Sequence, residues 1–299
     1  MRSHKLSIST AIIILFFNLS SYSQINLLDA QFFQNRYLAN PAMAGFEIGT
    51  RASLGYRNQW STIPGAPIDQ NFTLDHRSNK AGAGLSVINA KAGDLSHTKV
   101  HGTYSYALPL NDGSSKFHFG INFGFQRTSF NAENVVGDRN DRNIVNFNDR
   151  ETILDGDFGL GFSNERLIVD GAIYNLKNQL TQDGSDLDLG TDFNLYYLGA
   201  AYSIPFAEWK INTKLAYRKI KNFNDLVDVG VEVRTSNDKL GFTGLYHTNK
   251  SSTFGISYLH RKEWQLLAMY NTTARPIANY ANGTFEVALQ VNLHNLKIN

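Results

Sequence analysis

Apolar and polar residues alternate along much of this chain with a period of two. In the clearest stretch, from Lys116 to Gln126, phenylalanine or isoleucine occupies every odd position, whereas the even positions carry polar residues and glycine. This period predicts a β-strand with one apolar and one polar face. The alternation recurs near 98–108, 154–163, 210–218, 227–234 and 285–293. Polar faces with charged and amide groups do not suit a dry sandwich core, but they do suit a water-filled barrel lumen.

The pattern predicts fourteen strands, an even number of the kind found in single-chain outer-membrane barrels. The expected strands lie near 48–57, 68–75, 80–90, 97–110, 116–127, 154–163, 167–175, 193–204, 209–218, 225–234, 239–247, 252–260, 264–272 and 283–293. The connections after even-numbered strands are short. Several connections after odd-numbered strands are long, namely 58–67, 128–153, 176–192 and 273–282.

Short turns on one side and long loops on the other are typical of outer-membrane barrels, with the short turns in the periplasm. A β-sandwich predicts no such odd-even rule. The predicted fold class is therefore an all-β transmembrane antiparallel up-and-down β-barrel of about 14 strands.

The N-terminus has the features of a cleaved secretory signal peptide. A basic start precedes an apolar run from Ala11 to Phe17, and serines occupy positions 21 and 23 before a cut expected at Gln24. The run is too short to cross a membrane as a helix. Three regions are predicted: a signal peptide at 1–23, a periplasmic N-terminal segment at 24–47 that could plug the barrel or dock a partner, and an outer-membrane barrel at 48–299.

Composition narrows the class further. The 299 residues include no cysteine, so neither a lipoprotein anchor nor a disulfide framework is expected. After residue 23 no stretch approaches 18 consecutive apolar residues, which argues against helical membrane spans. A net charge of +2 is too small to indicate a nucleic-acid partner. The 20 Phe, 14 Tyr and 24 Gly suit either a barrel or a secreted sandwich, and the alternation favours the barrel.

The stretch from 38 to 60, LANPAMAGFEIGTRASLGYRNQW, is interpreted as the approach to the first strand. Asn40 and Pro41 end the preceding segment, and Gly45 permits a turn. Alternation then divides the strand into a lipid-facing set (Ile48, Ala52, Leu54 and Tyr56) and a lumen-facing set (Arg51, Ser53 and Arg57). Tyr56 and Trp60 are expected where the strand leaves the membrane, the usual level of amphipathic aromatic rings.

The same residues carry a family resemblance. NPAMAG at 40–45, YRNQW at 56–60 and GAP at 65–67 resemble the N-terminal signature of the PorP/SprF family. Further matches are AGAGLSV at 81–87, YSYAL at 104–108 and NGTFEVALQV at 282–291. Each motif is short, but together they follow the family's order along nearly the whole mature chain.

The resemblance implies an outer-membrane β-barrel of the type IX secretion system, a machinery of Bacteroidota that is tied to gliding motility. Members of the family are thought to help export or surface-anchor cargo proteins. The partners implied are outer-membrane lipid, a secreted cargo protein or its C-terminal sorting domain, and periplasmic secretion-machine subunits. No nucleic acid is expected, and the implied location is the outer membrane.

The motif residues Asn40, Pro41, Gly45, Tyr56, Arg57, Gln59 and Trp60 are the candidate site, with either a partner-binding or a structural role. Arginine and tryptophan are favoured anchors at protein interfaces. The alternative is a lumenal Arg57 paired with Asp69 or Asp75, beside an interfacial Trp60.

Two other functions remain open at this point. A general diffusion porin needs an open lumen. The polar faces of the fifth and sixth strands carry four glycines, which leave such space unless a plug fills it. A lipid-modifying enzyme needs a nucleophile beside a base, and no serine lies at a suggestive spacing from His101, His118 or His247. With no phosphate-binding glycine loop and no HExxH, catalytic residues, cofactors and metals are not expected.

Overall fold

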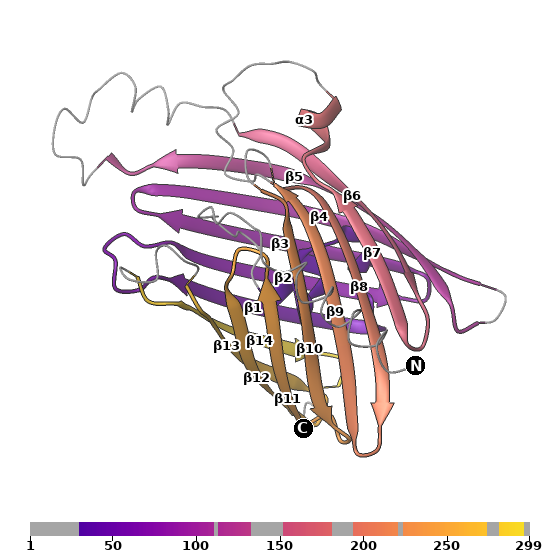
Figure 1. Ribbon diagram of the computed structural model, residues 1–299. Coiled ribbons are helices and arrows are strands. Elements are labelled where there is room, and N and C mark those ends of the chain that lie inside the picture. Colours follow the sequence, from indigo (N-terminus) through magenta and orange to yellow (C-terminus); the bar gives the residue numbers. More distant parts are fainter. Residues whose placement is uncertain are drawn as a thin grey trace, which may run out of the picture.

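Fourteen antiparallel strands close into one barrel in the computed structural model, which describes residues 30–110, 113–132, 152–180, 194–220, 224–273 and 281–295 (Figure 1). Each strand pairs with its neighbours in the sequence, and β1 closes the barrel against β14. The strands are β1 (Gly49–Gln59), β2 (Ile68–Ser78), β3 (Ala81–Ala92), β4 (Leu95–Pro109), β5 (Lys116–Phe130), β6 (Ile153–Ser163), β7 (Leu167–Ile173), β8 (Asn194–Phe206), β9 (Trp209–Ile220), β10 (Leu226–Thr235), β11 (Leu240–His247), β12 (Ser252–His260), β13 (Trp264–Asn271) and β14 (Thr284–Asn292).

The predicted fold class is confirmed, and each of the fourteen expected strands corresponds to an observed one. The differences are at the ends: β2 continues to Ser78 and β5 to Phe130, while β7 stops at Ile173. The expected signal peptide at 1–23 lies outside the described residues, as do most of the two longest connections. No helix in the described ranges is long and apolar enough to cross a membrane.

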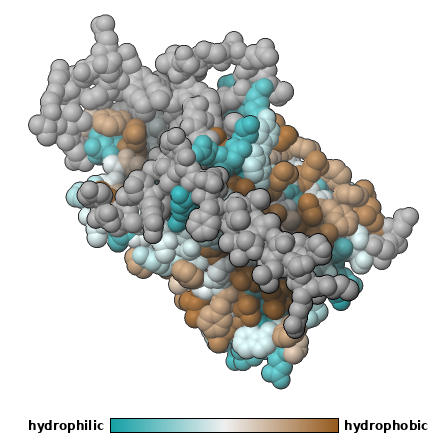
Figure 2. Space-filling view, in the orientation of Figure 1, coloured by the Kyte–Doolittle hydropathy of each residue, from teal (hydrophilic) through white to brown (hydrophobic). Residues whose placement is uncertain are grey.

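The two faces of the strands separate as the alternation predicts. On β5, Phe119 and Phe123 point outward with 41% and 63% of their surface exposed, whereas His118 is 2% exposed inside. Hydrophobic side chains gather on the outer surface, visible in Figure 2, where lipid would cover them. The interior buries charged and amide side chains instead, and ion pairs join neighbouring strands there, as between Arg57 of β1 and Asp69 of β2.

The short strand β7 makes the wall irregular. It pairs with β6 only from Phe158 to Ser163, and the chain then leaves the sheet at Tyr174 and enters the helix α3 (Leu176–Leu180). Two carboxylates of β6 hold the segment that follows β7. Asp157 accepts from the backbone N of Asn175, and Asp155 accepts from the backbone N of Lys177, both at 2.9 Å. Side-chain acceptors thus replace the missing strand pairing.

Candidate functional site: the plugged barrel lumen

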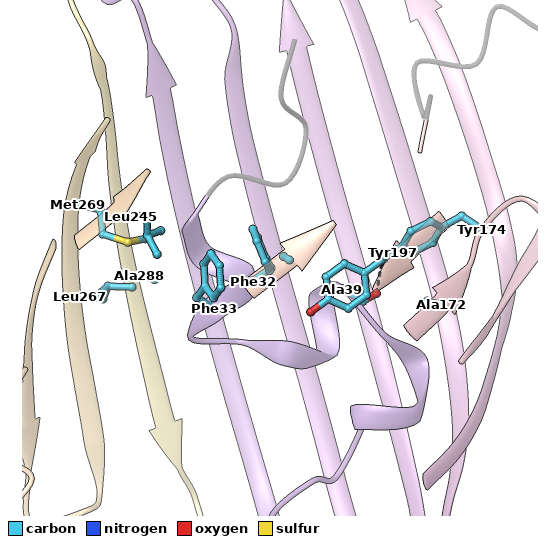
Figure 3. Close-up of a cluster of buried hydrophobic side chains, with 11 residues drawn as sticks. Phe32, Phe33, Ala39, Ala172, Tyr174, Tyr197, Leu245, Leu267, Met269 and Ala288 are labelled. Carbon is cyan, nitrogen blue, oxygen red and sulfur yellow. Dashed lines mark hydrogen bonds between the residues drawn. The ribbon is translucent and has the colours of Figure 1, made fainter. Parts of the chain in front are cut away.

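Residues 30–45 lie inside the barrel and are called the plug here (Figure 3). The plug contains three short 3-10 helices, η1 (Ala30–Phe33), η2 (Arg36–Leu38) and η3 (Pro41–Met43), and η3 packs against β4, β5 and β6. Its side chains are almost fully enclosed, with Phe32 2% and Met43 0% exposed. A peptide of this kind is stable inside a barrel only if its polar groups find partners on the wall.

Asn40 is the best-anchored residue of the plug. Its side-chain oxygen accepts from the backbone N of Ala42 at 2.9 Å and so caps η3, whose first residue is Pro41. Its Nδ2 donates to the carbonyls of Leu160 on β6 and Gly171 on β7, at 2.9 and 3.0 Å. Asn40 is therefore fully satisfied while 0% exposed, and it joins the plug to the β6–β7 wall.

Three further contacts reinforce this attachment. The guanidinium of Arg36 lies 3.7 Å from the carboxylate of Asp170, which also accepts from Asn40 at 3.2 Å. The hydroxyl of Tyr174, where the chain leaves β7, donates to the carbonyl of Ala39, the dashed contact in Figure 3. The irregular end of β7 is thus part of the surface that holds the plug.

Other strands hold the plug from the remaining directions. On the β2–β4 side, Asn35 donates to Thr73 at 2.8 Å, and the hydroxyls of Tyr37 and Thr103 are 2.6 Å apart. On the opposite side, the ammonium of Lys214 donates to the carbonyl of Phe33 at 2.7 Å. Burial raises the pKa of Tyr37, because the phenolate would be poorly solvated inside the barrel.

Aromatic contacts complete the packing around η1. Phe32 meets Tyr197 edge-on, with ring centroids 6.0 Å apart, and the guanidinium of Arg218 lies 4.8 Å from the Phe32 ring. Together with the polar bonds, these contacts tie the plug to both halves of the barrel.

Inward-facing glycines make room for the plug. A Cβ atom at Gly120 would lie 2.3 Å from the backbone N of Ala42, and one at Gly159 would lie 1.9 Å from the side-chain oxygen of Asn40. At Gly161 it would meet the end of the Met43 side chain at 2.2 Å. A side chain at Gly120 would collide with the plug backbone, and one at Gly159 with Asn40, whereas at Gly161 only the end of the Met43 side chain would have to move. The glycines on these polar faces therefore make room for the plug.

The rest of the lumen is a set of paired charges. Arg57 lies 2.9 Å from Asp69 and 3.6 Å from Glu286, and Lys99 lies 3.5 Å from Asp157. Beside the plug, a cavity of about 60 Å³ is lined by residues such as Lys99, His101 and Tyr174. That volume holds a few water molecules.

Several histidines pair with hydroxyl groups inside the wall. His247 lies between Asp228 and Thr253, in the order acid, imidazole, hydroxyl that some hydrolases use. All three residues are 0% exposed, so a substrate cannot reach the hydroxyl. His118 and Ser163 form a similar pair at 2.8 Å, and it is also buried. Within the described ranges, no group of three or more His, Cys, Asp or Glu side chains could hold a metal ion.

The seven candidate site residues fall into two places. Asn40, Pro41 and Gly45 belong to the plug, where Gly45 has a φ of +62° and its N donates to Asp75 at 2.9 Å. The other four lie at the end of β1: Tyr56 points outward, Arg57 and Gln59 point into the lumen, and Trp60 follows the strand.

The expected pairing of Arg57 with Asp69 is present, whereas Asp75 pairs with Arg51 at 3.4 Å. A partner-binding role for the motif stays a prediction. Sequence reasoning did not find the plug's anchors on the wall, such as Thr103, Asp170 and Tyr174. The only signal for them was the row of inward glycines.

The closed barrel, its apolar outer surface and its occupied polar lumen define a β-barrel of the outer-membrane class. The sequence profile of the type IX secretion system membrane protein PorP/SprF family matches residues 22–291. The chain belongs to this family.

Solved structures share the fold at low sequence identity. The monoaromatic hydrocarbon channel CymD has 9% identity and a TM-score of 0.54, with 91% of this chain and 95% of that one covered. The toluene transporter TbuX of Ralstonia pickettii has 11% identity and a TM-score of 0.52, covering 92% and 95%. A comparison with curated sequences finds no match. At these identities the likeness concerns the fold alone.

Replacing Gly120 with leucine should unseat the plug, because the new side chain would occupy the position of Ala42. The chain has no cysteine, so Ala39→Cys provides a single reporter at a position that is 1% exposed. We expect a maleimide to label this thiol at least about tenfold faster when Gly120→Leu is present, because the plug leaves its protected site.

Gly102→Leu is the matched control, since a Cβ at that outward-facing glycine meets only a backbone oxygen at 3.9 Å. Equal labelling rates in the Gly120 and Gly102 variants would mean that the glycine wall does not hold the plug.

Replacing Arg57 with methionine should destabilise the barrel by about 3–5 kcal/mol, because it leaves the buried carboxylates of Asp69 and Glu286 without their arginine. Adding Asp69→Asn and Glu286→Gln should recover most of that loss, since the remaining groups are then neutral. Denaturant unfolding from lipid bilayers measures both differences. If the triple variant were as unstable as the single one, lost packing rather than unpaired charge would be the cause.

Proposed function

We propose that this protein is an outer-membrane component of the type IX secretion and gliding machinery, exported through a cleaved signal peptide. In this role it assists the export or surface anchoring of cargo proteins through protein–protein contacts. The observation that carries the proposal is the anchored plug, which favours a binding scaffold over a diffusion porin. Membership of the PorP/SprF family supports the type IX secretion system as the machinery in which it works.

A porin depends on a continuous water-filled channel. Here the plug bonds to β2, β4, β6, β7 and β9, and a cavity of about 60 Å³ lies beside it. Several buried charges on the wall are paired with one another, as in the Arg57–Asp69 and Arg218–Asp228 contacts. Binding to other proteins then falls to the rims of the barrel.

One rim offers a preorganised surface where the barrel closes. Trp60 donates its backbone N to the carbonyl of Gly283 at 3.2 Å, and the side chain of Asn282 donates to Ser61 at 2.7 Å. Thr62 adds a contact to Asn282 at 3.4 Å. We call Trp60, Ser61, Thr62 and Asn282 the closure rim; it joins two segments 220 residues apart in the sequence.

The closure rim also brings together the two family motifs at 56–60 and 282–291, since Arg57 pairs in register with Glu286 and Gln59 with Thr284. Trp60 with neighbouring exposed hydroxyl and amide groups is suited to anchoring a protein partner. The rim lies on the side of the long connections, which points outward from the cell in barrels of this class. A cargo protein or its C-terminal sorting domain is the partner proposed for it.

Affinity purification of the tagged protein from native outer membranes, with mass spectrometry of the bound proteins, tests this role. We expect a large surface protein or periplasmic secretion subunits to co-purify. Trp60→Ala should lower the recovery of the surface protein by about tenfold or more, as for an interface hot spot. Trp209→Ala, an exposed tryptophan at the other rim, should leave it unchanged. A barrel recovered alone would remove the main support for the proposal.

Planar-bilayer conductance separates the scaffold from a porin. The intact barrel should be nearly silent, whereas deletion of residues 24–45 should produce steady current, because the inward glycines then border an empty lumen. Heat-modifiable gel mobility verifies that the shortened barrel is folded. Large steady currents through the intact protein would instead identify a diffusion porin.

A further inference from the structure

A long apolar groove crosses the outer wall of the barrel from β5 to β9, with a volume of about 900 Å³. Its lining includes six outward-facing residues: Phe158 and Leu160 on β6, Gly171 and Ile173 on β7, Leu198 on β8 and Lys219 on β9. We call it the wall groove. Figure 2 shows hydrophobic residues gathered on this part of the surface, and the volume is in the range of about 300–1,000 Å³ typical of ligand pockets.

Strand pairing explains why the wall is hollow here. Gly171 lies in register between Leu160 and Leu198 and adds no side chain of its own to this row of the outward face. The end of the Leu198 side chain leans toward it, 2.9 Å from where a Cβ would lie. On the inner side, the carbonyls of Leu160 and Gly171 both accept from Asn40 of the plug. The floor of the groove is therefore held from within, and its shape is set before any ligand binds.

The next row gives the groove a polar end. Phe158, Ile173, Tyr196 and Lys219 are successive partners in register across β6 to β9. Lys219 lies near the end of β9, on the side of the long connections, and its side chain is exposed. A ligand that fills the groove thus meets hydrocarbon along its length. At the outer end it meets the Lys219 ammonium and the hydroxyl of Tyr217, which donates to the exposed carboxylate of Asp225 at 2.7 Å.

We propose that the wall groove binds a phosphate-bearing glycolipid of the outer leaflet, with an acyl chain along Gly171 and its phosphate paired with Lys219. The groove faces the membrane, where acyl chains are the abundant apolar partner, and a basic side chain at the headgroup level attracts anionic lipid. This proposal rests on the outward orientation of the long connections, but on no particular cargo.

The test uses the full-length protein purified in mild detergent after exchange into bilayers of lipopolysaccharide, phosphatidylglycerol or phosphatidylethanolamine. Native mass spectrometry then counts the lipid molecules retained. We expect retention of lipopolysaccharide, which Lys219→Glu should lower about tenfold by reversing the charge that meets the phosphate. Lys91→Glu is the matched control, because Lys91 is also exposed near the same end of its strand, β3.

A second pair of variants tests the acyl chain. Ile173→Trp should fill the groove and lower retention, whereas Ile256→Trp, at an exposed outward position on β12, should not. Equal retention in the Lys219 and Lys91 variants would overturn the proposal, and so would equal retention of phosphatidylglycerol. Recovery of a second copy or another protein chain crosslinked at Leu198→Cys would also overturn it. None of these results depends on cargo binding, so this test and that of the proposed function fail separately.

Discussion

The structure depends on the requirement that every backbone amide inside a bilayer has a hydrogen-bond partner within the protein. The pairing of β1 with β14 meets this requirement, because it leaves the sheet without an open edge. A closed sheet of alternating strands then has one face in hydrocarbon and one around a lumen. The outer face became apolar, and the inner face collected the arginines, carboxylates and histidines that lipid would not tolerate.

Such a lumen is costly unless its charges are paired and its space is filled. The pairs Arg57–Asp69 and Arg218–Asp228 address the charges, and the plug fills the space. Wall and plug are mutually adapted: Gly120 and Gly159 lack the side chains that would collide with Ala42 and Asn40. Without the plug the glycines would border an empty, water-filled lumen, and without the wall the plug has no core of its own.

A filled barrel offers its surroundings only its rims and its outer wall. The closure rim presents Trp60 beside polar groups, which suits a protein, whereas the wall groove presents hydrocarbon ending at Lys219, which suits a lipid. Asn40 links the lumen to the outer wall, because it anchors the plug to the backbone that forms the groove's floor.

Local order in the sequence was enough to predict the strands. Alternation alone assigns Phe123 to the outer face and Asn122 to the inner face, and the lengths of the connections distinguish the two ends of the barrel. Both signals can be read locally, because they depend on residues that are close together in the sequence. The alternation also predicted that Arg57 faces the lumen and that its acidic partner lies on the next strand. It could not reveal Glu286, because β1 meets β14 only when the sheet closes. Nor could it reveal that Asn40 bonds to Gly171, 131 residues away. The tertiary structure decided those contacts, since they require a lumen that exists only once all fourteen strands have paired.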